Sequence, residues 1–273
     1  MNTIVVYVAA FILYAALAFH FWRTRWGGIG AEHMALWERG AILAPLALHT
    51  WLLYDILFGQ AELRFGFGQA LSVTLWVAVL LYWVESLFFR LEGMQAPILA
   101  LAAVTSPLPA LFPGLPSPPY AHSLELRLHL LLAMLAYGLF TIAALHAALM
   151  TLMERHLHGG PVLGPFAALP PLLTMERLLF RVILAGFVLL TLTLATGMVN
   201  SEVVFGRSMT FTHETVFGVT SWIIFAALLA GRHFYGWRGR IALRWTLAGF
   251  IALLLAYVGS RFVLEVILHR GMA

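Results

Sequence analysis

Cysteine and lysine are both absent from this chain of 273 residues. Without cysteine there can be no disulfide, no thiolate-bound metal and no CxxC-type motif. Charge is scarce as well. Charged residues make up 10% of the chain and hydrophobic residues 62%, against roughly 25% and 45–50% in soluble domains. This composition indicates a protein that folds in apolar surroundings.

Long apolar stretches occupy most of the sequence. Eight of them have about the length that a helix needs to cross the hydrocarbon core, roughly 20 residues. Because backbone polar groups inside a bilayer must be satisfied within the segment, each stretch is predicted to be a helix. The sequence therefore predicts an all-α, polytopic transmembrane bundle, forming a single integral membrane domain over residues 1–273. The predicted spans are residues 3–22, 41–58, 69–89, 94–112, 128–152, 179–199, 214–232 and 241–266.

The arginines are distributed unevenly between alternate loops. Most of the 16 lie in the loops after the first, third, fifth and seventh stretches. Because basic residues accumulate in short cytoplasmic loops, these loops are predicted to face the cytoplasm and both termini the outside. A bacterial inner membrane is the expected location. The five arginines that lie in the other set of loops are Arg64, Arg127, Arg207, Arg261 and Arg270.

Two segments complicate this topology. The fourth stretch contains several prolines and leads into a proline-rich connector; if it does not cross, the orientation of everything after it inverts. Residues 172–179 are predicted to form a separate short helix along the membrane interface. The basic residues form no continuous tract, so membrane lipid rather than nucleic acid is the expected partner.

Two histidines lie at membrane depth. His49 is at the middle of the second stretch, and His146 is in the inner third of the fifth. Ionisable residues inside a bilayer are costly and tend to mark function, so both are candidates for an intramembrane transit site. The alternative is a hydrogen bond to a neighbouring helix, and the sequence leaves both possibilities open.

A second group of histidines is predicted at the outer face: His122, His129, His213 and His269. Imidazole ligates haem iron, and two imidazoles from different helices form a bis-His site. The alternative is that each is an ordinary interfacial residue at a helix end. Arg261 and Glu265, four apart in the last stretch, lie on one helix face and can pair with each other.

The run HETVFGVTSWIIFAALLAGRHFYGWRGRIALRWTLAGFIALLLAYVGSRFVLE resembles the C-terminal part of the cytochrome c assembly protein family (CcsA/CcmC type). It is most similar to the HemX/YpjD branch of eight-span inner-membrane proteins. The GWRGR turn, followed by an apolar helix that carries Gly259, is the most specific part of this resemblance. The segments LPPLLTMERLLFRVILAGFVLLTLTLATG and LHLLLAMLAYGLFTIAAL are similar to the matching regions of that branch.

The resemblance implies haem as a cofactor. Haem-handling members hold haem on the outer face between two histidines, one opening a helix and one beyond the last span. His129 falls at the first place and His269 near the second, and His213 is a further candidate iron ligand. Arg261 could contact haem propionates, because a guanidinium suits carboxylate recognition. The Trp-rich loop ending in WD is replaced here by VVFGRSMTFTHETVFG, which has neither residue.

Three functions remain open. The first is a protein that binds or passes haem at its periplasmic face in cytochrome c maturation, with a maturation component as partner. The second is a non-enzymatic partner or regulator of another inner-membrane protein that keeps the fold without haem presentation. The third, a transporter, would need matching broken helices in the two halves, and only the fourth stretch is broken. The sequence has no GxSxG, Walker or HExxH motif, so an enzyme is not expected.

Overall fold

The computed structural model describes residues 3–26, 34–58, 64–89, 93–114, 123–157, 171–205 and 212–268. Their long elements are all helices, which confirms the predicted fold class. In chain order the helices are α1 (Thr3–Phe21), η1 (Trp22–Trp26), α2 (Leu36–Phe58), α3 (Phe67–Phe88), α4 (Gln95–Thr105), α5 (Leu108–Leu111), α6 (Leu124–Leu157), α7 (Leu172–Phe205), α8 (His213–Tyr235), α9 (Gly239–Leu254), η4 (Leu255–Gly259), α10 (Ser260–Phe262) and η5 (Val263–Ile267).

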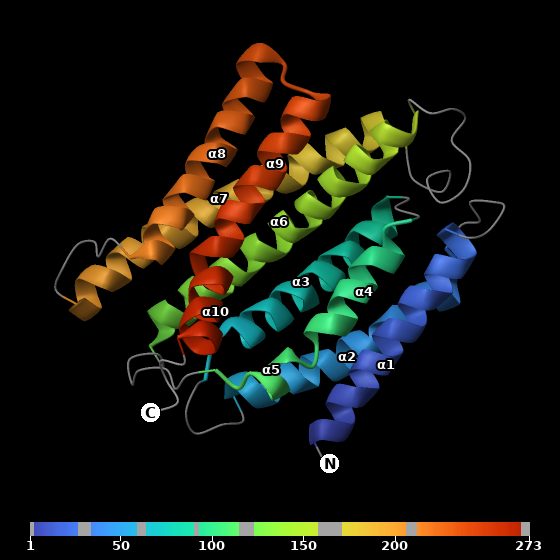
Figure 1. Cartoon of the computed structure of the whole chain (residues 1–273), viewed down its shortest axis with the longest axis horizontal. Coiled ribbons are helices and arrows are strands. Elements are labelled where there is room, and N and C mark those ends of the chain that lie inside the picture. Colours follow the sequence, from blue (N-terminus) through green and yellow to red (C-terminus); the bar gives the residue numbers. More distant parts are fainter. Residues whose placement is uncertain are drawn as a thin grey trace.

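The helices run back and forth between two ends of one bundle (Figure 1). Six of the helical segments are long and apolar enough to cross a membrane by length and composition, and Gln95–Leu111 is a shorter apolar stretch. Helix α2, which is not one of these six segments, is 23 residues long. The start of α1 and the end of the last helix lie at the same end of the bundle. This arrangement fits termini on one side of the membrane.

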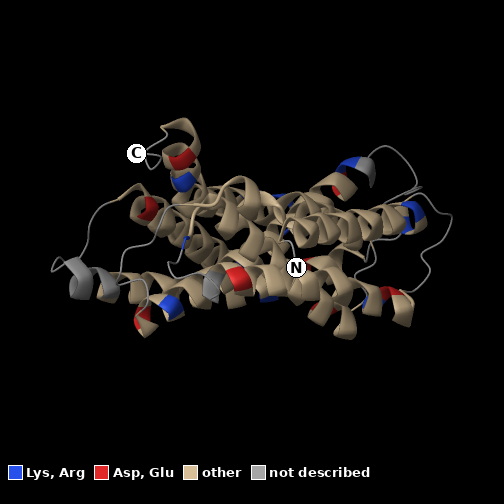
Figure 2. Cartoon of the chain, turned by 90° about the horizontal axis from the view of Figure 1, so that it is seen from below, with Lys and Arg blue, Asp and Glu red and all other residues tan. Residues whose placement is uncertain are grey.

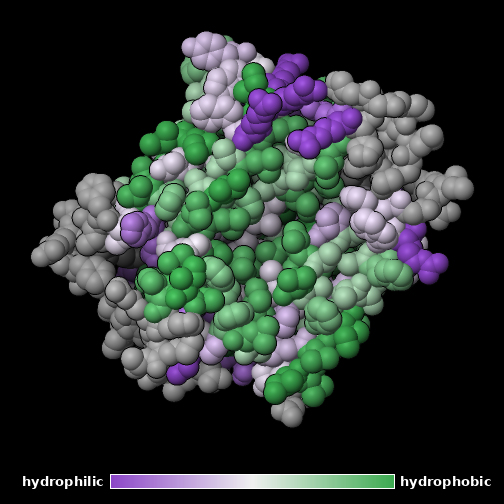
Figure 3. Space-filling view, viewed as in Figure 1, coloured by the Kyte–Doolittle hydropathy of each residue, from purple (hydrophilic) through white to green (hydrophobic). Residues whose placement is uncertain are grey.

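Charged residues and hydrophobic residues occupy different parts of the bundle. Most Arg, Asp and Glu positions lie toward the ends of the helices (Figure 2). The middle of the face seen in Figure 3 is covered by hydrophobic residues, with hydrophilic ones at its margins. Large apolar side chains such as Ile4, Val188 and Ile251 are more than half exposed. Such a belt is the surface that lipid would cover.

The fourth predicted span is broken in the structure. Helix α4 ends at Thr105, and α5 begins at Leu108 after a turn through Ser106 and Pro107. Proline has no backbone N–H and clashes with the preceding helical turn, so the break falls where the sequence places Pro107. The hydroxyl of Ser106 donates to the carbonyl oxygen of Ala103 at 3.1 Å, which keeps the polar group at the break paired.

The prediction of a separate interfacial helix at residues 172–179 is wrong. These residues are the first two turns of α7, which continues unbroken to Phe205. The carbonyl oxygen of Pro171 accepts hydrogen bonds from the N–H groups of Thr174 and Met175 and so starts the helix. The reason for the continuity is packing: Met175, Leu179 and Ile183 are fully buried at helical spacing along one face.

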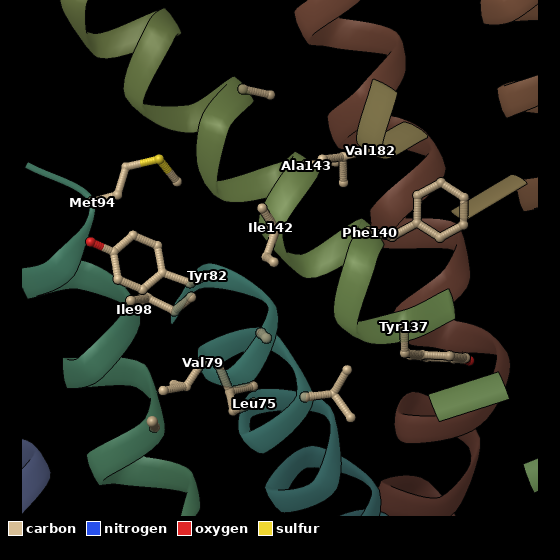
Figure 4. Packing of buried hydrophobic residues seen from close by; sticks show 14 of the residues in the cluster. Leu75, Val79, Tyr82, Met94, Ile98, Tyr137, Phe140, Ile142, Ala143 and Val182 are labelled. Atoms are coloured by element: carbon tan, nitrogen blue, oxygen red, sulfur yellow. The ribbon is translucent and has the colours of Figure 1, made fainter. Parts of the chain in front are cut away.

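Close helix approaches at small residues hold the centre of the bundle together. A Cβ added to Gly138 of α6 would collide with the side chain of Val77 on α3, and one added to Gly186 of α7 would lie 3.1 Å from the ring of Phe140. Phe140 stacks on Phe225 of α8 with ring centroids 3.9 Å apart. Small residues at a contact let helices approach closely. Figure 4 shows buried residues around α6, where Ile142 and Ala143 lie between Leu75, Val79 and Tyr82 of α3 on one side and Val182 of α7 on the other.

Candidate functional site

His129 lies in the second turn of α6, against α7. Its Nδ1 is 3.0 Å from the hydroxyl oxygen of Thr196. That hydroxyl is also 2.9 Å from the carbonyl oxygen of Leu192 and 3.1 Å from that of Thr193. Carbonyl oxygens only accept, so a Thr196 hydroxyl that donates to its own helix is free to accept from Nδ1–H. In the tautomer that satisfies all of these contacts the proton sits on Nδ1, and Nε2 keeps the lone pair that a metal requires.

A glycine on α7 makes room for the ring. A Cβ at Gly197 would lie 3.2 Å from Cε1 of His129. Any larger side chain there would therefore press on the imidazole. With Thr196 on Nδ1 and Gly197 under Cε1, the half-buried ring is held in one orientation. An outer hydrogen bond of this kind is what orients metal-binding imidazoles in proteins.

His213 begins α8 at the same end of the bundle as the start of α6 (Figure 1). Its side chain is exposed. Thr212 caps the helix, with its hydroxyl accepting from the N–H of Thr215 at 3.3 Å. Glu214 is the residue after His213, and its Oε1 lies 3.7 Å from Nε of Arg261. Arg261 is thus brought beside the helix start that carries His213.

The expected pairing of Arg261 with Glu265 is replaced by this ion pair with Glu214. The last helix is wound as π-helix over residues 255–259 and 263–267. The wider turns shift the side chains away from the usual spacing of four, and such segments are frequent at functional sites. Glu265 instead lies against the start of α3, with its carboxylate close to where a Cβ on Gly66 would lie.

Four residues named from the sequence, His122, Arg207, His269 and Arg270, lie outside the described residues. The described residues contain no cluster of three or more His, Cys, Asp or Glu that could hold a metal ion. The iron-ligand prediction for His129, His213 and His269 therefore stays a prediction.

His49 is fully buried in α2 and has a partner on each ring nitrogen. Nε2 lies 2.8 Å from Oγ of Ser72 on α3, and Nδ1 lies 3.3 Å from the hydroxyl of Tyr14 on α1. Each partner is a hydroxyl that can donate or accept, so both nitrogens are satisfied in either neutral tautomer. One imidazole thus joins three helices, which is the hydrogen-bonding alternative that the sequence left open.

His146 has a different environment. It is also fully buried, and its Nδ1 lies 3.0 Å from the carbonyl oxygen of Ile142 one turn earlier. Nε2 has no hydrogen-bond partner among the described residues. The two intramembrane histidines therefore differ: His49 is fully paired and His146 has a free lone pair.

Sequence reasoning missed an ionic cluster at the other end of the bundle. Nη2 of Arg25 is 2.7 Å from Oε2 of Glu38, and Nε2 of His20 is 2.8 Å from Oε1. The N–H of Ala35 donates to the same carboxylate at 2.8 Å. Arg25 and Glu38 are each 4% exposed. The sequence feature that could have predicted this cluster is an Arg just after the first apolar stretch and a Glu just before the second.

Known proteins with similar sequences include several membrane proteins. The Escherichia coli K12 protein named "Inner membrane protein YpjD" is 36% identical over 139 residues, which are 51% of this chain and 52% of that protein. The chain thus matches about half the length of that relative. An Azospirillum brasilense protein described as "Uncharacterized 28.8 kDa protein in nifR3-like 5'region" is 28% identical over 255 residues, 89% of this chain and 91% of that protein.

A protein of more specific name matches over a shorter region. The "Cytochrome c biogenesis protein CcsA" of Prochlorococcus marinus strain MIT 9515 is 35% identical over 89 residues, 33% of this chain and 28% of that protein. No solved structure matches. Residues 40–268 match the family described as "Cytochrome C assembly protein". Because this match covers most of the chain, the protein belongs to the cytochrome c assembly protein family.

Proposed function

We propose that the protein binds or passes haem at the periplasmic face of a bacterial inner membrane during cytochrome c maturation. Membership of the family supports haem handling, and the names of the YpjD and CcsA relatives support the location and the pathway. The single observation that carries the proposal is the geometry of His129: its Nδ1 lies 3.0 Å from the Thr196 hydroxyl, a contact that leaves Nε2 able to ligate iron.

The side chains at the end of the bundle where α6 and α8 begin are of the types that bind haem. His129 would supply one axial nitrogen, and His213 or His269 the other. Arg261 sits beside the start of α8 and would face a propionate, exchanging part of its pairing with Glu214. Bound haem would supply an iron centre whose reduction potential the two imidazoles set. The side chains named here would hold and orient that group.

Passage across the membrane would require a second site. His49 and His146 are the intramembrane candidates for it. At His49 an incoming ligand would have to displace Tyr14 or Ser72. At His146 Nε2 has no hydrogen-bond partner among the described residues, and the neighbouring Ile142, Ala143 and Ala147 are fully buried.

An absorption spectrum of the detergent-purified protein tests this function. Protein expressed with ample haem should be red and show the sharp visible bands of low-spin, bis-imidazole iron. Added hemin should produce the same bands in protein expressed without haem. A colourless protein whose spectrum does not change with hemin would contradict the proposal.

A second candidate function is that of a non-enzymatic partner or regulator of another inner-membrane protein. The sequence favours it through the loop at residues 203–218, which lacks the Trp-rich platform of haem-presenting members. Under this function a defined membrane protein should copurify with the chain, and His129→Ala should leave the copurification intact. Loss of the partner in His129→Ala, together with loss of haem, would favour the haem function instead.

A further inference from the structure

Two arginines near the turn between α8 and α9 have carboxylate partners on neighbouring helices. Nη1 of Arg232 lies 2.7 Å from Oε1 of Glu176 on α7, and Nε of Arg240 lies 3.4 Å from Oε2 of Glu154 on α6. In each pair the carboxylate balances the charge of the guanidinium. An arginine at this end of the bundle that has no such partner leaves its positive charge for something outside the bundle.

Arg177 and Arg181, near the start of α7, are two such arginines. Both are exposed, and neither forms an ion pair with another described residue. Because they are four residues apart, they project from one helix face one turn from each other. Like charges at this spacing repel and destabilise a helix. An anion bound between the two guanidinium groups would remove that repulsion.

The same face of α7 continues as an apolar strip. Leu184 and Val188 follow Arg181 at helical spacing and are 54% and 52% exposed, whereas Met175 and Leu179 on the opposite face are fully buried. Val188 comes seven residues after Arg181, which is about 10 Å along the helix axis. The strip therefore runs from a cationic end toward the middle of the membrane region, and its exposure shows that no described helix covers it.

We propose that the face of α7 formed by Arg177, Arg181, Leu184 and Val188 binds one anionic phospholipid. Its phosphate lies between the two guanidinium groups, which bind phosphate oxygens through paired hydrogen bonds. One acyl chain lies over Leu184 and Val188. Basic residues beside a membrane helix attract the anionic lipids of the cytoplasmic leaflet, the side on which the arginine count places this end. An acidic protein segment would match the arginines but not the apolar strip. The proposal does not depend on haem binding.

Lipid binding to the full-length, detergent-purified protein tests this site. Phosphatidylglycerol is titrated, and native mass spectrometry gives the dissociation constant of the first bound lipid. Arg177→Gln and Arg181→Gln should each weaken binding about fivefold, the contribution of one arginine near an anionic surface, and the double variant about 25-fold. Phosphatidylcholine, whose phosphate charge is balanced by choline, should bind the wild type more weakly. An excess of inorganic phosphate should not displace phosphatidylglycerol, because it has no acyl chain to cover the apolar strip.

Arg240→Gln/Arg244→Gln is the matched control. It removes two arginines at the same spacing, but Glu154 already balances Arg240, so binding should weaken no more than about fivefold. The midpoint of thermal unfolding checks that each variant folds. Equal losses of affinity in the two double variants would overturn the proposal. So would equal affinities of the wild type for phosphatidylglycerol and phosphatidylcholine, or displacement of the lipid by inorganic phosphate. The haem absorption of the same samples reports separately on the proposed function.

Discussion

Nε2 of His49 lies 2.8 Å from Oγ of Ser72, and this bond ties α2 to α3 in the middle of the membrane region. Together with the contact from Nδ1 to Tyr14, it uses both nitrogens of the ring. His129 and His146 each have Nδ1 engaged by an acceptor and keep the lone pair of Nε2. The three histidines therefore divide into one that joins helices and two that can ligate.

Replacing His49 should destabilise the bundle without abolishing haem binding. His49→Leu leaves the hydroxyls of Tyr14 and Ser72 buried without this partner, which costs about 1–3 kcal/mol. The midpoint of thermal unfolding in detergent should fall. His213→Ala, at an exposed position, should leave the midpoint unchanged. If His49→Leu unfolds at the wild-type midpoint, the helix-joining role is wrong.

Gly138 should be intolerant of any side chain. An alanine Cβ there would collide with Val77, so Gly138→Ala should cost about 1–3 kcal/mol as an overpacked core does. Val77→Ala removes the obstructing atoms and should restore part of the loss in the double variant. Gly218→Ala is the control, because its Cβ would make only an ordinary 3.5 Å contact with Leu194. Equal stabilities of the two alanine variants would refute the close approach of α3 and α6.

The buried ion pair between Arg25 and Glu38 should matter far more than the exposed pair between Arg240 and Glu154. Arg25→Met leaves the Glu38 carboxylate buried without its guanidinium, a change that costs about 3–5 kcal/mol. Arg240 is 65% exposed at the side chain, so Arg240→Ala should cost less than about 1 kcal/mol. Chemical denaturation of both variants measures the difference. A smaller loss for Arg25→Met than for Arg240→Ala would contradict the burial of the first pair.

Thr196 should act on haem through His129. Thr196→Val removes the acceptor for Nδ1–H, and the proton can then move to Nε2. Haem affinity should fall about 10- to 100-fold, as it does when outer-shell partners of metal ligands are removed. Thr220→Val is the matched control, because that exposed hydroxyl bonds only the carbonyl of Val216 in its own helix. Hemin titrations of both variants give the affinities; unchanged affinity in Thr196→Val would remove Thr196 from the site.

Most of the fold follows from apolar length and from proline. The predicted spans are helical, and the fourth is interrupted at Pro107 between α4 and α5. Hydropathy does not report where a helix ends, because a helix continues beyond the apolar part wherever packing supports it. For that reason α6 and α7, with 34 residues each, extend past their predicted spans at both ends.

The candidate site is less accessible to sequence reasoning. Residue type and depth single out His49, His129 and His146, but not what each contacts. Thr196 is 67 residues from His129, and no local pattern connects them. The partner of Arg261 was also missed, since a spacing of four implies one helix face only where the winding is regular.

One comparison of spectra tests whether His129, and not His49, ligates haem at the outer site. Hemin is added to the wild type, His129→Ala and His49→Leu at equal concentrations of folded protein. Low-spin, bis-imidazole bands are expected in the wild type and in His49→Leu, and they should be lost in His129→Ala. Persistence of these bands in His129→Ala, or their loss in folded His49→Leu, would contradict it.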